Sequence, residues 1–463
     1  MAVRNKGGLD MTEGSIWRLL VAFAFPLLLG NVFQQLYSTV DSYVVGNFVS
    51  SQALAAVGST GHITSSLIGF YSGLAGGAGI VVSQYYGAKD YDMVRKTMQT
   101  AVIMTFVMSI VITVLGVTLS PAMLRMMQTP ADVWDDAVGY LTITFAGTTA
   151  LLMYNIGAGV LQAVGNTRMP LVALIISAVT NVVLDLVFVI YFDMGVKGVA
   201  WATVIAQVCA AIFVFWVLMT VDAPYRVNLL KMKFYPNIFK RVFVIGLPSG
   251  LQMSITSFSN IFVQSYVNAF GSACMAGYTI YGKIDTFAFL PRNCISAAGA
   301  TFAGQNVGAG NNERVMQGMR TTQILSFVVT VMGMIPVLVF RRGLTAFFNT
   351  DPEVIRYGAI WLLTITPFYL LGCYTDPMVS VLRGAGETRA PMFIMLGSFV
   401  VFRQIYLFIL TRLTDSFMVM AFAYPAGWVM SFLGTIFYFY KGHWRERCLV
   451  QPKSPPKPSE DTA

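Results

Sequence analysis

The phrase LQAVGNTRMP, residues 161–170, returns as LRGAGETRAP at residues 382–391. Five of the ten positions are identical in the two copies, which lie 221 residues apart. A second pair of phrases has the same offset, because SQYYGAKDYDMVRKTM at 83–98 matches GQNVGAGNNERVMQGM at 304–319. Since two separate phrases share one offset, the sequence predicts that one structural unit occurs twice.

The repeated phrase also has a local role at the end of a helix. Gly165 and Gly386 can end one helix, because glycine readily adopts the backbone conformation found just past a helix C-terminus. Pro170 and Pro391 can open the next helix, where a missing N–H group costs nothing. Each copy is therefore predicted to be a tight turn between two helices.

The composition is that of a membrane protein. Of the 463 residues, 56% are hydrophobic and 11% are charged, whereas about a quarter of the residues of a soluble protein are charged. Apolar runs such as 101–120 and 324–340 approach the roughly 20 residues with which a helix crosses a bilayer. They lack the period-two alternation of a membrane β-barrel. We therefore expect an all-α polytopic membrane protein and not a large soluble α/β enzyme.

The hydropathy pattern predicts twelve transmembrane helices. They cover roughly 16–45, 53–86, 93–120, 133–163, 170–192, 196–221, 238–270, 275–307, 313–340, 354–381, 391–411 and 416–440. The N-terminus lacks the short apolar core and small-residue cleavage site of a removable signal peptide.

Basic residues predict the orientation of these helices. The N-terminal segment, the even-numbered loops and the tail carry 21 Lys and Arg, and the odd-numbered loops carry six. Since basic loops stay in the cytoplasm, both termini are expected on the cytoplasmic side of the cell membrane. The net charge of +9 is then a topology signal and does not indicate nucleic-acid binding.

The repeat divides the chain into two lobes. The predicted segments are an N-terminal cytoplasmic segment at 1–15, an N-lobe at 16–221, a cytoplasmic linker at 222–237, a C-lobe at 238–440 and a disordered cytoplasmic tail at 441–463. Six spans per lobe give both lobes the same orientation, so a pseudo-twofold axis along the membrane normal should relate them. Two such lobes around a central cavity form a transporter architecture, here expected to be a monomer embedded in membrane lipid.

These motifs resemble those of the multidrug and toxic compound extrusion (MATE) family, in its prokaryotic DinF-like branch. The resemblance rests on FPLLLGNVFQQLYSTVDSYVVG at 25–46 and on both pairs of repeated phrases, and it covers about residues 14–445. It implies a twelve-helix, two-lobe fold. It also implies export of bulky, often cationic organic compounds, driven by inward flow of H⁺ or Na⁺.

Acidic residues inside the predicted spans are candidates for function, because a charge in the membrane is costly to desolvate. Asp41 lies in the first span and shares a helix face with Gln34 and Tyr37, at spacings of three and four residues. Asn181 and Asp185 are four residues apart and also share a face. A purely structural role, in which polar neighbours stabilise these acids, is the alternative.

The resemblance implies that these acids belong to a cation site in the N-lobe. The site would comprise the side chains of Asp41, Asn181, Asp185 and Thr203 and the backbone carbonyl of Val199. Hard oxygen ligands and two carboxylates suit Na⁺. They suit H⁺ equally well, because two neighbouring carboxylates cannot both ionise cheaply in a low dielectric. Apart from this coupling ion, no cofactor is expected.

The remaining candidates concern the substrate and the conformational change. The expected substrate cavity comprises Gln34, Tyr37, Met153, Asn155, Gln162, Lys283, Asp285 and Asp376. For Asp285 and Asp376 a structural role is equally favoured. Pro26 is a predicted hinge of the first helix, because proline leaves a helix carbonyl without a partner. The seventh span lacks the glutamate expected in the other branch of the family, so cation coupling should be confined to the N-lobe.

Other functions fit the sequence less well. There is no Ser/His/Asp set, no metal-ligand set and no GxxxxGK[ST] motif, so we expect no enzyme. A lipid-linked oligosaccharide flippase of the same wider superfamily is the main alternative, but it should carry a more cationic cavity. A non-transporting membrane scaffold is a third possibility, and a buried acid pair argues against it.

Overall fold

The protein is a bundle of long helices preceded by a short hairpin. The computed structural model describes residues 4–5, 8–49, 51–126, 129, 133–223, 225–228, 231–414 and 416–444. The predicted tail beyond Trp444 lies outside the described residues. Strands β1 (Arg4–Asn5) and β2 (Gly8–Leu9) pair antiparallel before the first helix.

The first half of the chain forms six helical spans. These are α1 (Ile16–Val44) with η1 (Val45–Val49), α2 (Ser51–Gly87), α3 (Tyr91–Met126), α4 (Trp134–Ala146) with α5 (Thr148–Ala163), α6 (Arg168–Leu186) with η3 (Val187–Tyr191), and α7 (Gly195–Thr220). Helices α4 and α5 form one broken span with a bend of 44°.

The second half repeats this arrangement. Its spans are α8 (Pro236–Asn268), α9 (Ser272–Gly308), α10 (Asn312–Val339), α12 (Pro352–Ile365) with η5 (Thr366–Phe368) and α13 (Tyr369–Gly384), α14 (Arg389–Leu396) with η6 (Gly397–Phe402) and α15 (Arg403–Leu413), and α16 (Phe417–Ala421) with α17 (Ala423–Lys441). Each predicted span corresponds to one helix or one broken helix. The short helix α11 (Arg341–Phe348), which the sequence assigned to a loop, is additional.

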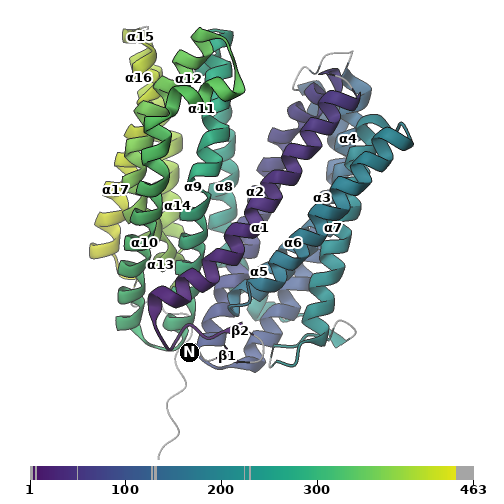
Figure 1. The fold of residues 1–463 in the computed structure, drawn as a ribbon. Coiled ribbons are helices and arrows are strands. Elements are labelled where there is room, and N and C mark those ends of the chain that lie inside the picture. The colour runs from purple at the N-terminus through teal and green to yellow at the C-terminus, as the bar shows by residue number, and fades with distance from the viewer. Residues whose placement is uncertain are drawn as a thin grey trace, which may run out of the picture.

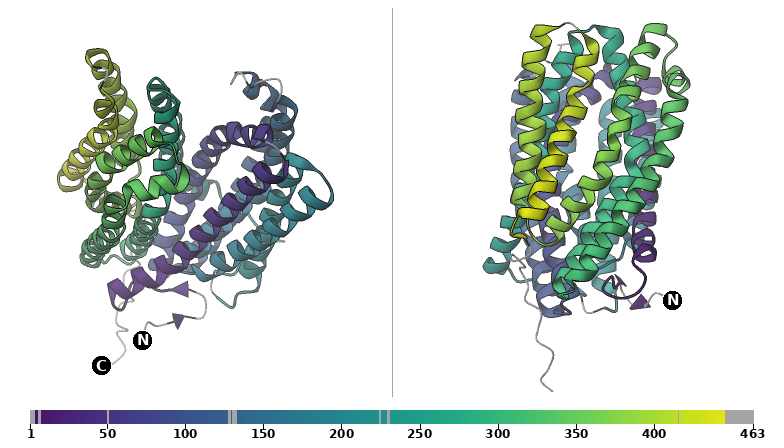
Figure 2. Two further views of the ribbon diagram at one scale, coloured as in Figure 1. Left: turned by 45° about the horizontal axis from the view of Figure 1, so that its top comes forward. Right: turned by 90° about the vertical axis from the view of Figure 1, so that its left-hand side faces the viewer.

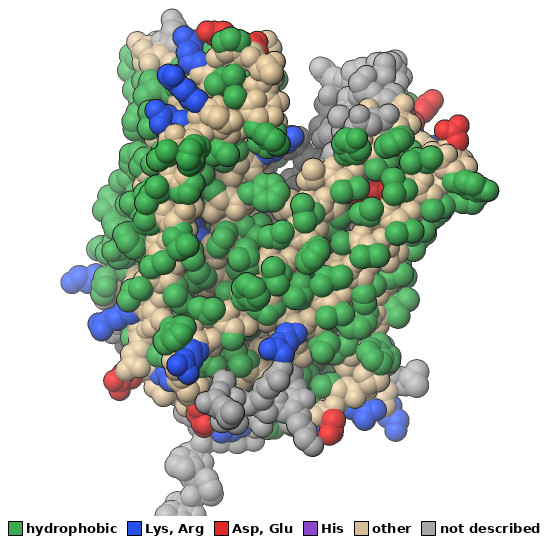
Figure 3. All heavy atoms as spheres, viewed as in Figure 1, with side chains coloured by type: hydrophobic (Ala, Val, Ile, Leu, Met, Phe, Trp, Pro, Cys, Tyr) green, Lys and Arg blue, Asp and Glu red, His purple; other side chains and the backbone are tan. Residues whose placement is uncertain are grey.

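Most of these helices are suited to a membrane. Nine of the described helices are long and apolar enough to cross it, and α4 with α5 makes a tenth span. Helices α2 and α9 are of similar length and pack against helices of the opposite lobe. Figure 3 shows hydrophobic side chains over most of the visible face, with charged side chains toward the two ends.

The two lobes lie side by side and touch at one end of the molecule. The ribbons of α1–α7 and of α8–α17 meet near β1 and β2 and diverge toward the other end (Figures 1 and 2). We call the end formed by residues 83–90, 161–170, 304–311 and 382–391 the closed end, and the opposite end the open end. Both pairs of repeated phrases therefore lie where the lobes touch.

The repeated phrases form the same turn in both lobes. Gly165 and Gly386 have positive φ angles of 85° and 89°. The N–H of each glycine donates to the carbonyl three residues earlier, and the next N–H donates to the carbonyl five residues earlier, all at 2.8 Å. This is the Schellman motif. The side chains of Asn166 and Glu387 then accept from backbone N–H groups of the following helix, so the predicted helix-to-helix turn is confirmed.

Helices α2 and α8 cross through glycines. A Cβ atom on Gly73 would overlap the backbone of Gly250, and one on Gly77 would overlap the backbone of Gly246. The glycines on each helix are four residues apart, so each pair lines one face. Small residues at this spacing let two membrane helices approach backbone to backbone. This crossing joins the lobes on the side of the closed end.

Two buried glutamines link the lobes symmetrically. The Nε2 of Gln84 in the N-lobe donates to the carbonyl of Gly384 in the C-lobe at 2.7 Å. The Nε2 of Gln305 in the C-lobe donates to the carbonyl of Ala163 in the N-lobe at 3.0 Å. Both glutamines are fully buried. Each repeated turn is therefore held by a side chain from the opposite lobe, as the pseudo-twofold relation requires.

The N-terminal segment strengthens this closed end. The N–H of Met11 donates to Oε1 of Gln305 at 2.9 Å, and its carbonyl accepts from Nδ2 of Asn306 at 3.1 Å. The Met11 side chain is buried in a cluster of residues from α1 and α9. Gly8, in β2, lies against the carbonyl of Val164 in the N-lobe. Residues 8–11 thus contact both lobes at the closed end.

Candidate functional site

Three adjoining cavities run from the N-lobe across the boundary between the lobes into the C-lobe. The N-lobe cavity has a volume of about 170 Å³, the middle cavity about 280 Å³ and the C-lobe cavity about 540 Å³. Asn155, Gly159 and Gln162 line both of the first two cavities, and Ala297 and Ala300 line both of the last two. We therefore treat the three cavities as one central chamber.

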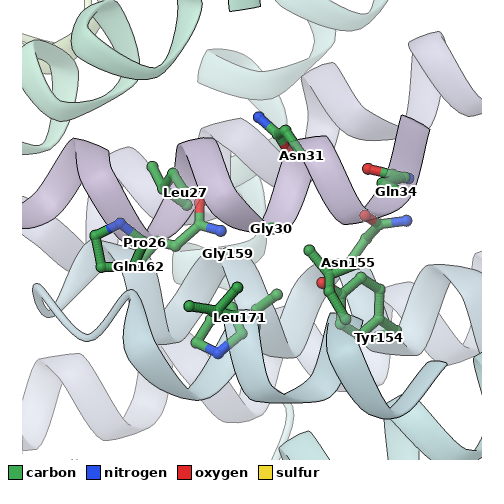
Figure 4. Close-up of a pocket in the computed structure, with 13 residues that line it drawn as sticks. Pro26, Leu27, Gly30, Asn31, Gln34, Tyr154, Asn155, Gly159, Gln162 and Leu171 are labelled. Carbon is green, nitrogen blue, oxygen red and sulfur yellow. The ribbon is translucent and has the colours of Figure 1, made fainter. Parts of the chain in front are cut away.

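The N-lobe end of the chamber is polar but uncharged. Helix α1 contributes Asn31 and Gln34, and α5 contributes Asn155 and Gln162. Figure 4 shows Gln34 beside Asn155 at one end of this cavity and Pro26 beside Gln162 at the other. The structure thus brings together three of the predicted cavity residues, Gln34, Asn155 and Gln162.

The residues of the predicted cation site come from three neighbouring helices of the same lobe. Asp41 comes from α1, Asn181 and Asp185 from α6, and Thr203 from α7. Asp185 is fully buried and Asn181 is 1% exposed. The Asp41 carboxyl lies within hydrogen-bonding reach of both side chains. Residues that are distant in the sequence therefore meet at one point.

Several buried oxygen atoms of this cluster accept no hydrogen bond. The Oδ1 of Asp41, both carboxylate oxygens of Asp185 and the Oδ1 of Asn181 are buried without a hydrogen-bond partner. The Nδ2 of Asn181 donates to the hydroxyl of Thr203 at 3.4 Å, and that hydroxyl donates to the carbonyl of Val199 at 3.0 Å. Buried acceptors without donors are costly, and a bound cation or proton would satisfy them.

The donor set fits a hard monovalent cation or a proton. Two carboxylates, one amide oxygen and one hydroxyl are oxygen ligands, and Val199 orients the hydroxyl through its carbonyl. A proton shared between Asp41 and Asp185 would remove one of two charges that repel each other. Among the described residues, no three or more His, Cys, Asp or Glu side chains lie close enough together to hold a metal ion.

Two further residues border the acid pair, and the sequence did not single them out. Tyr140 on α4 lies near Asp41 and Asp185. Gln207, four residues after Thr203 on α7, is within reach of Tyr37 and has a buried Oε1 without a partner. The spacing of four residues could have indicated Gln207, whereas only the tertiary fold brings Tyr140 to the site.

Tyr37 connects the acid pair to the chamber. Its hydroxyl lies within reach of Gln34 and Gln207, and Asp41 is close by. Tyr154, which lines the N-lobe cavity, is also near it. Met153, in contrast, packs against the hydrophobic core of the N-lobe and lines none of the three cavities.

The predicted cavity residues of the C-lobe lie in different surroundings. Asp376 lines the C-lobe cavity, where its Oδ2 is 3.3 Å from Nε of Arg292. Asp285 accepts from the hydroxyl of Tyr281 at 3.4 Å and lines none of the three cavities. Lys283 is exposed, with its ammonium 5.8 Å from the centre of the Phe348 ring. Of these three, only Asp376 borders the chamber.

Helix α1 packs against both lobes. The half before Pro26 contacts the C-lobe, and the half after it contacts the N-lobe. Leu20 and Phe23 pack in a cluster with α9 of the C-lobe. Gly30 lies against Leu174 on α6 of the N-lobe. Pro26 lies between these two halves and also lines the N-lobe cavity. A bend there would move Asp41 relative to the C-lobe.

A known family model has the same internal repeat. The model MatE matches residues 26–187 and again residues 248–409, which together make up most of the chain. The chain belongs to the MatE family. In this MatE chain the two matches begin at Pro26 and Pro248, the prolines at corresponding places in α1 and α8.

Curated relatives of this MatE chain match it almost end to end. The probable multidrug resistance protein YoeA of Bacillus subtilis is 28% identical over 450 residues, covering 95% of this chain and 96% of that protein. The probable multidrug resistance protein YpnP of the same organism is 28% identical over 396 residues, covering 85% and 88%.

A solved structure also shares the fold of this MatE chain. It is described as the outward-facing conformation of a multidrug resistance MATE family transporter, and it matches with a TM-score of 0.86 at 20% identity, covering 92% of this chain and 96% of that chain. The chain thus has the twelve-helix, two-lobe membrane fold that the sequence predicted.

Proposed function

We propose that this protein is a secondary active exporter of amphipathic, often cationic, organic compounds. Inward flow of H⁺ or Na⁺ would drive it by alternating access, and it would move its substrate without converting it. The observation that supports this most strongly is the acid pair, because its buried, unsatisfied oxygens lie beside a chamber between two lobes. The printed names of the curated relatives agree with export of drugs.

The orientation follows from charge. The exposed arginines Arg168 and Arg389 lie at the closed end, and the excess of basic residues belongs to the same side of the predicted topology. The closed end would therefore face the cytoplasm, with both termini, in the cell membrane. The conformation described above is then open to the outside, with its chamber sealed from the cytoplasm.

The coupling would act through α1. A cation bound between Asp41 and Asp185 would draw the second half of α1 toward α6. Because the first half of α1 packs on the C-lobe, this movement would bend the helix near Pro26. The wall formed by Asn31 and Gln34 would then shift and expel the substrate outward. Release of the cation to the cytoplasm would reset the protein.

Flux into and out of proteoliposomes tests this function. Purified protein would be reconstituted into liposomes loaded with ethidium or with dansyl-phenylalanine. A Na⁺ gradient and a pH gradient would then be imposed in separate experiments. We expect one of the two gradients, imposed by itself, to move at least one of the dyes faster than in protein-free liposomes. Flux with Na⁺ alone identifies a Na⁺ site, and flux with pH alone identifies a proton site.

The same experiment separates the alternative function. A flippase for lipid-linked oligosaccharides would move its lipid between leaflets and would show no gradient-driven dye flux. Absence of dye flux under both gradients, from protein shown to be folded, would therefore contradict the proposed function and favour the flippase.

A further inference from the structure

The two lobes present opposite charges inside their spans. The N-lobe has the acid pair Asp41 and Asp185. The wall of the C-lobe cavity instead carries two arginines, Arg292 and Arg383, and one acid, Asp376. The C-lobe end of the chamber therefore has an excess of positive charge, which a cationic substrate would not favour.

Arg292 and Asp376 neutralise each other. The Nε of Arg292 is 3.3 Å from Oδ2 of Asp376, and its NH1 donates to the carbonyl of Tyr369 at 3.2 Å. Gly372 leaves room for this guanidinium, because a Cβ atom there would overlap it. Asp376 is thus already paired and offers little attraction to a cationic ligand.

Arg383 is less completely neutralised, because the nearby Asp376 is paired with Arg292. It lies in the last turn of α13, on the same helix face as Asp376, seven residues away. Its NH2 donates to the neutral Oε1 of Gln252 at 3.1 Å, and its Nε is buried without a partner. Among the residues that the structure describes, Arg383 forms no ion pair. A positive charge held away from water without an anion is costly.

The walls of this cavity offer both a polar anchor and an apolar surface. The hydroxyl of Ser296 lines the same cavity and is buried without a partner. Together with Arg383 it provides hydrogen-bond donors without acceptors, which suit an anion. Phe399, Trp428 and Met395 supply apolar and aromatic surface around them. A volume of about 540 Å³ suits a small organic molecule.

We propose that the C-lobe cavity binds the negatively charged group of an amphipathic substrate, a carboxylate or a phosphate. Arg383 holds this group, Ser296 donates to it, and the apolar part of the substrate lies against Phe399 and Trp428. The proposal rests on the proposed export function and names the charge of the substrate class. It extends the range of substrates beyond the cationic compounds expected from the sequence.

Binding of two dyes that differ only in one charge tests this proposal. Dansyl-phenylalanine carries a carboxylate, and dansyl-phenylalaninamide is neutral. With wild-type protein in phosphatidylcholine nanodiscs, fluorescence titration should show that the carboxylate binds about tenfold more tightly or better, the usual size of one charge-assisted hydrogen bond. The variant Arg383→Gln should lose this preference while binding the amide as the wild type does.

Matched variants exclude a general effect of substitution. Arg389→Gln removes the exposed arginine of the same phrase and should keep the preference, as should Arg383→Lys, which retains the charge. Asp376→Asn frees Arg292 and should strengthen carboxylate binding, so it tests the proposal even if Arg383→Gln fails to fold. Equal binding of both dyes by the wild type, or a preference that survives in folded Arg383→Gln, would overturn the proposal.

Two further comparisons show whether the anion is a lipid headgroup or a free amphiphile, and whether the export function or the anion site is refuted. If phosphatidylglycerol in the nanodisc competes with dansyl-phenylalanine, the site exists and its ligand is a lipid headgroup. If it does not compete, a free amphiphile is the ligand. Binding in nanodiscs needs no ion gradient, so a preference for the carboxylate without gradient-driven flux would refute the export function and leave this site standing.

Discussion

Replacing Asp41 with asparagine is expected to abolish cation-driven export and to leave the protein folded. Asparagine keeps the size of the side chain but cannot carry the charge that holds a cation or proton beside Asp185. Removing one charged partner from a buried pair costs about 3 kcal/mol, which corresponds to roughly a hundredfold loss of cation affinity. The measurement is the initial rate of dye flux under the gradient that drives the wild type.

The control for this variant is Asp135→Asn. Asp135 is an exposed acid in the first turn of α4, so its loss should leave the flux rate unchanged. Thermal unfolding in detergent would show that both variants are folded. Export at the wild-type rate by folded Asp41→Asn protein would show that the acid pair does not couple the cation to transport.

Valine at both Gly87 and Gly308 is expected to open the closed end and stop transport. The two glycines occupy equivalent places in the repeat. A Cβ atom on Gly87 would overlap the carbonyl of Gln305, and one on Gly308 would overlap the carbonyl of Gln84. Overpacking costs about 1–3 kcal/mol at each site. Separating the lobes there also breaks the hydrogen bonds that Gln84 and Gln305 make to the opposite lobe.

The opening can be measured as a distance between the repeated turns. Nitroxide labels at Arg168 and Arg389, both exposed, would report it by pulsed electron resonance in a background without native cysteines. We expect a longer distance in the double valine variant. Gly282→Val is the matched control on α9, because a Cβ atom at Gly282 meets open space. An unchanged distance distribution in the double variant would contradict the prediction that Gly87 and Gly308 keep the lobes together at the closed end.

The repeat was readable from sequence because its signal is local. The phrases at 161–170 and 382–391 contain the glycine, threonine and proline that a helix-to-helix turn needs, and the structure has that turn twice. The sequence did not show what the turns contact. The hydrogen bonds from Gln84 and Gln305 cross between lobes, and no spacing within one helix indicates such a contact.

The cluster that forms the candidate cation site was predicted only in part from the residues. Spacing places Asn181 and Asp185 on one helix face, but the resemblance to a known family was needed to bring Asp41 and Thr203 to them. Tyr140 was missed, because α4 approaches the site only in the folded protein.

Arg383 shows a different limit of sequence reading. The predicted spans 354–381 and 391–411 leave Arg383 in a loop at the membrane surface, whereas it lies in the last turn of α13 and lines the chamber. Helix ends are uncertain by a few residues in any sequence-based assignment. An arginine at such an end can therefore count as a topology signal and still face a cavity.

The most direct test of the account is whether the coupling cation expels bound substrate. The transported dye would be titrated into wild-type protein in nanodiscs, and its affinity would be measured with and without Na⁺ and across a range of pH. Coupling is reciprocal, so a cation that drives export must weaken dye binding. We expect the driving cation to release the dye from the wild type, and we expect Asp41→Asn protein to bind the dye whether or not the cation is present. Dye binding that ignores the cation in the wild type, or release that persists in the variant, would contradict the account.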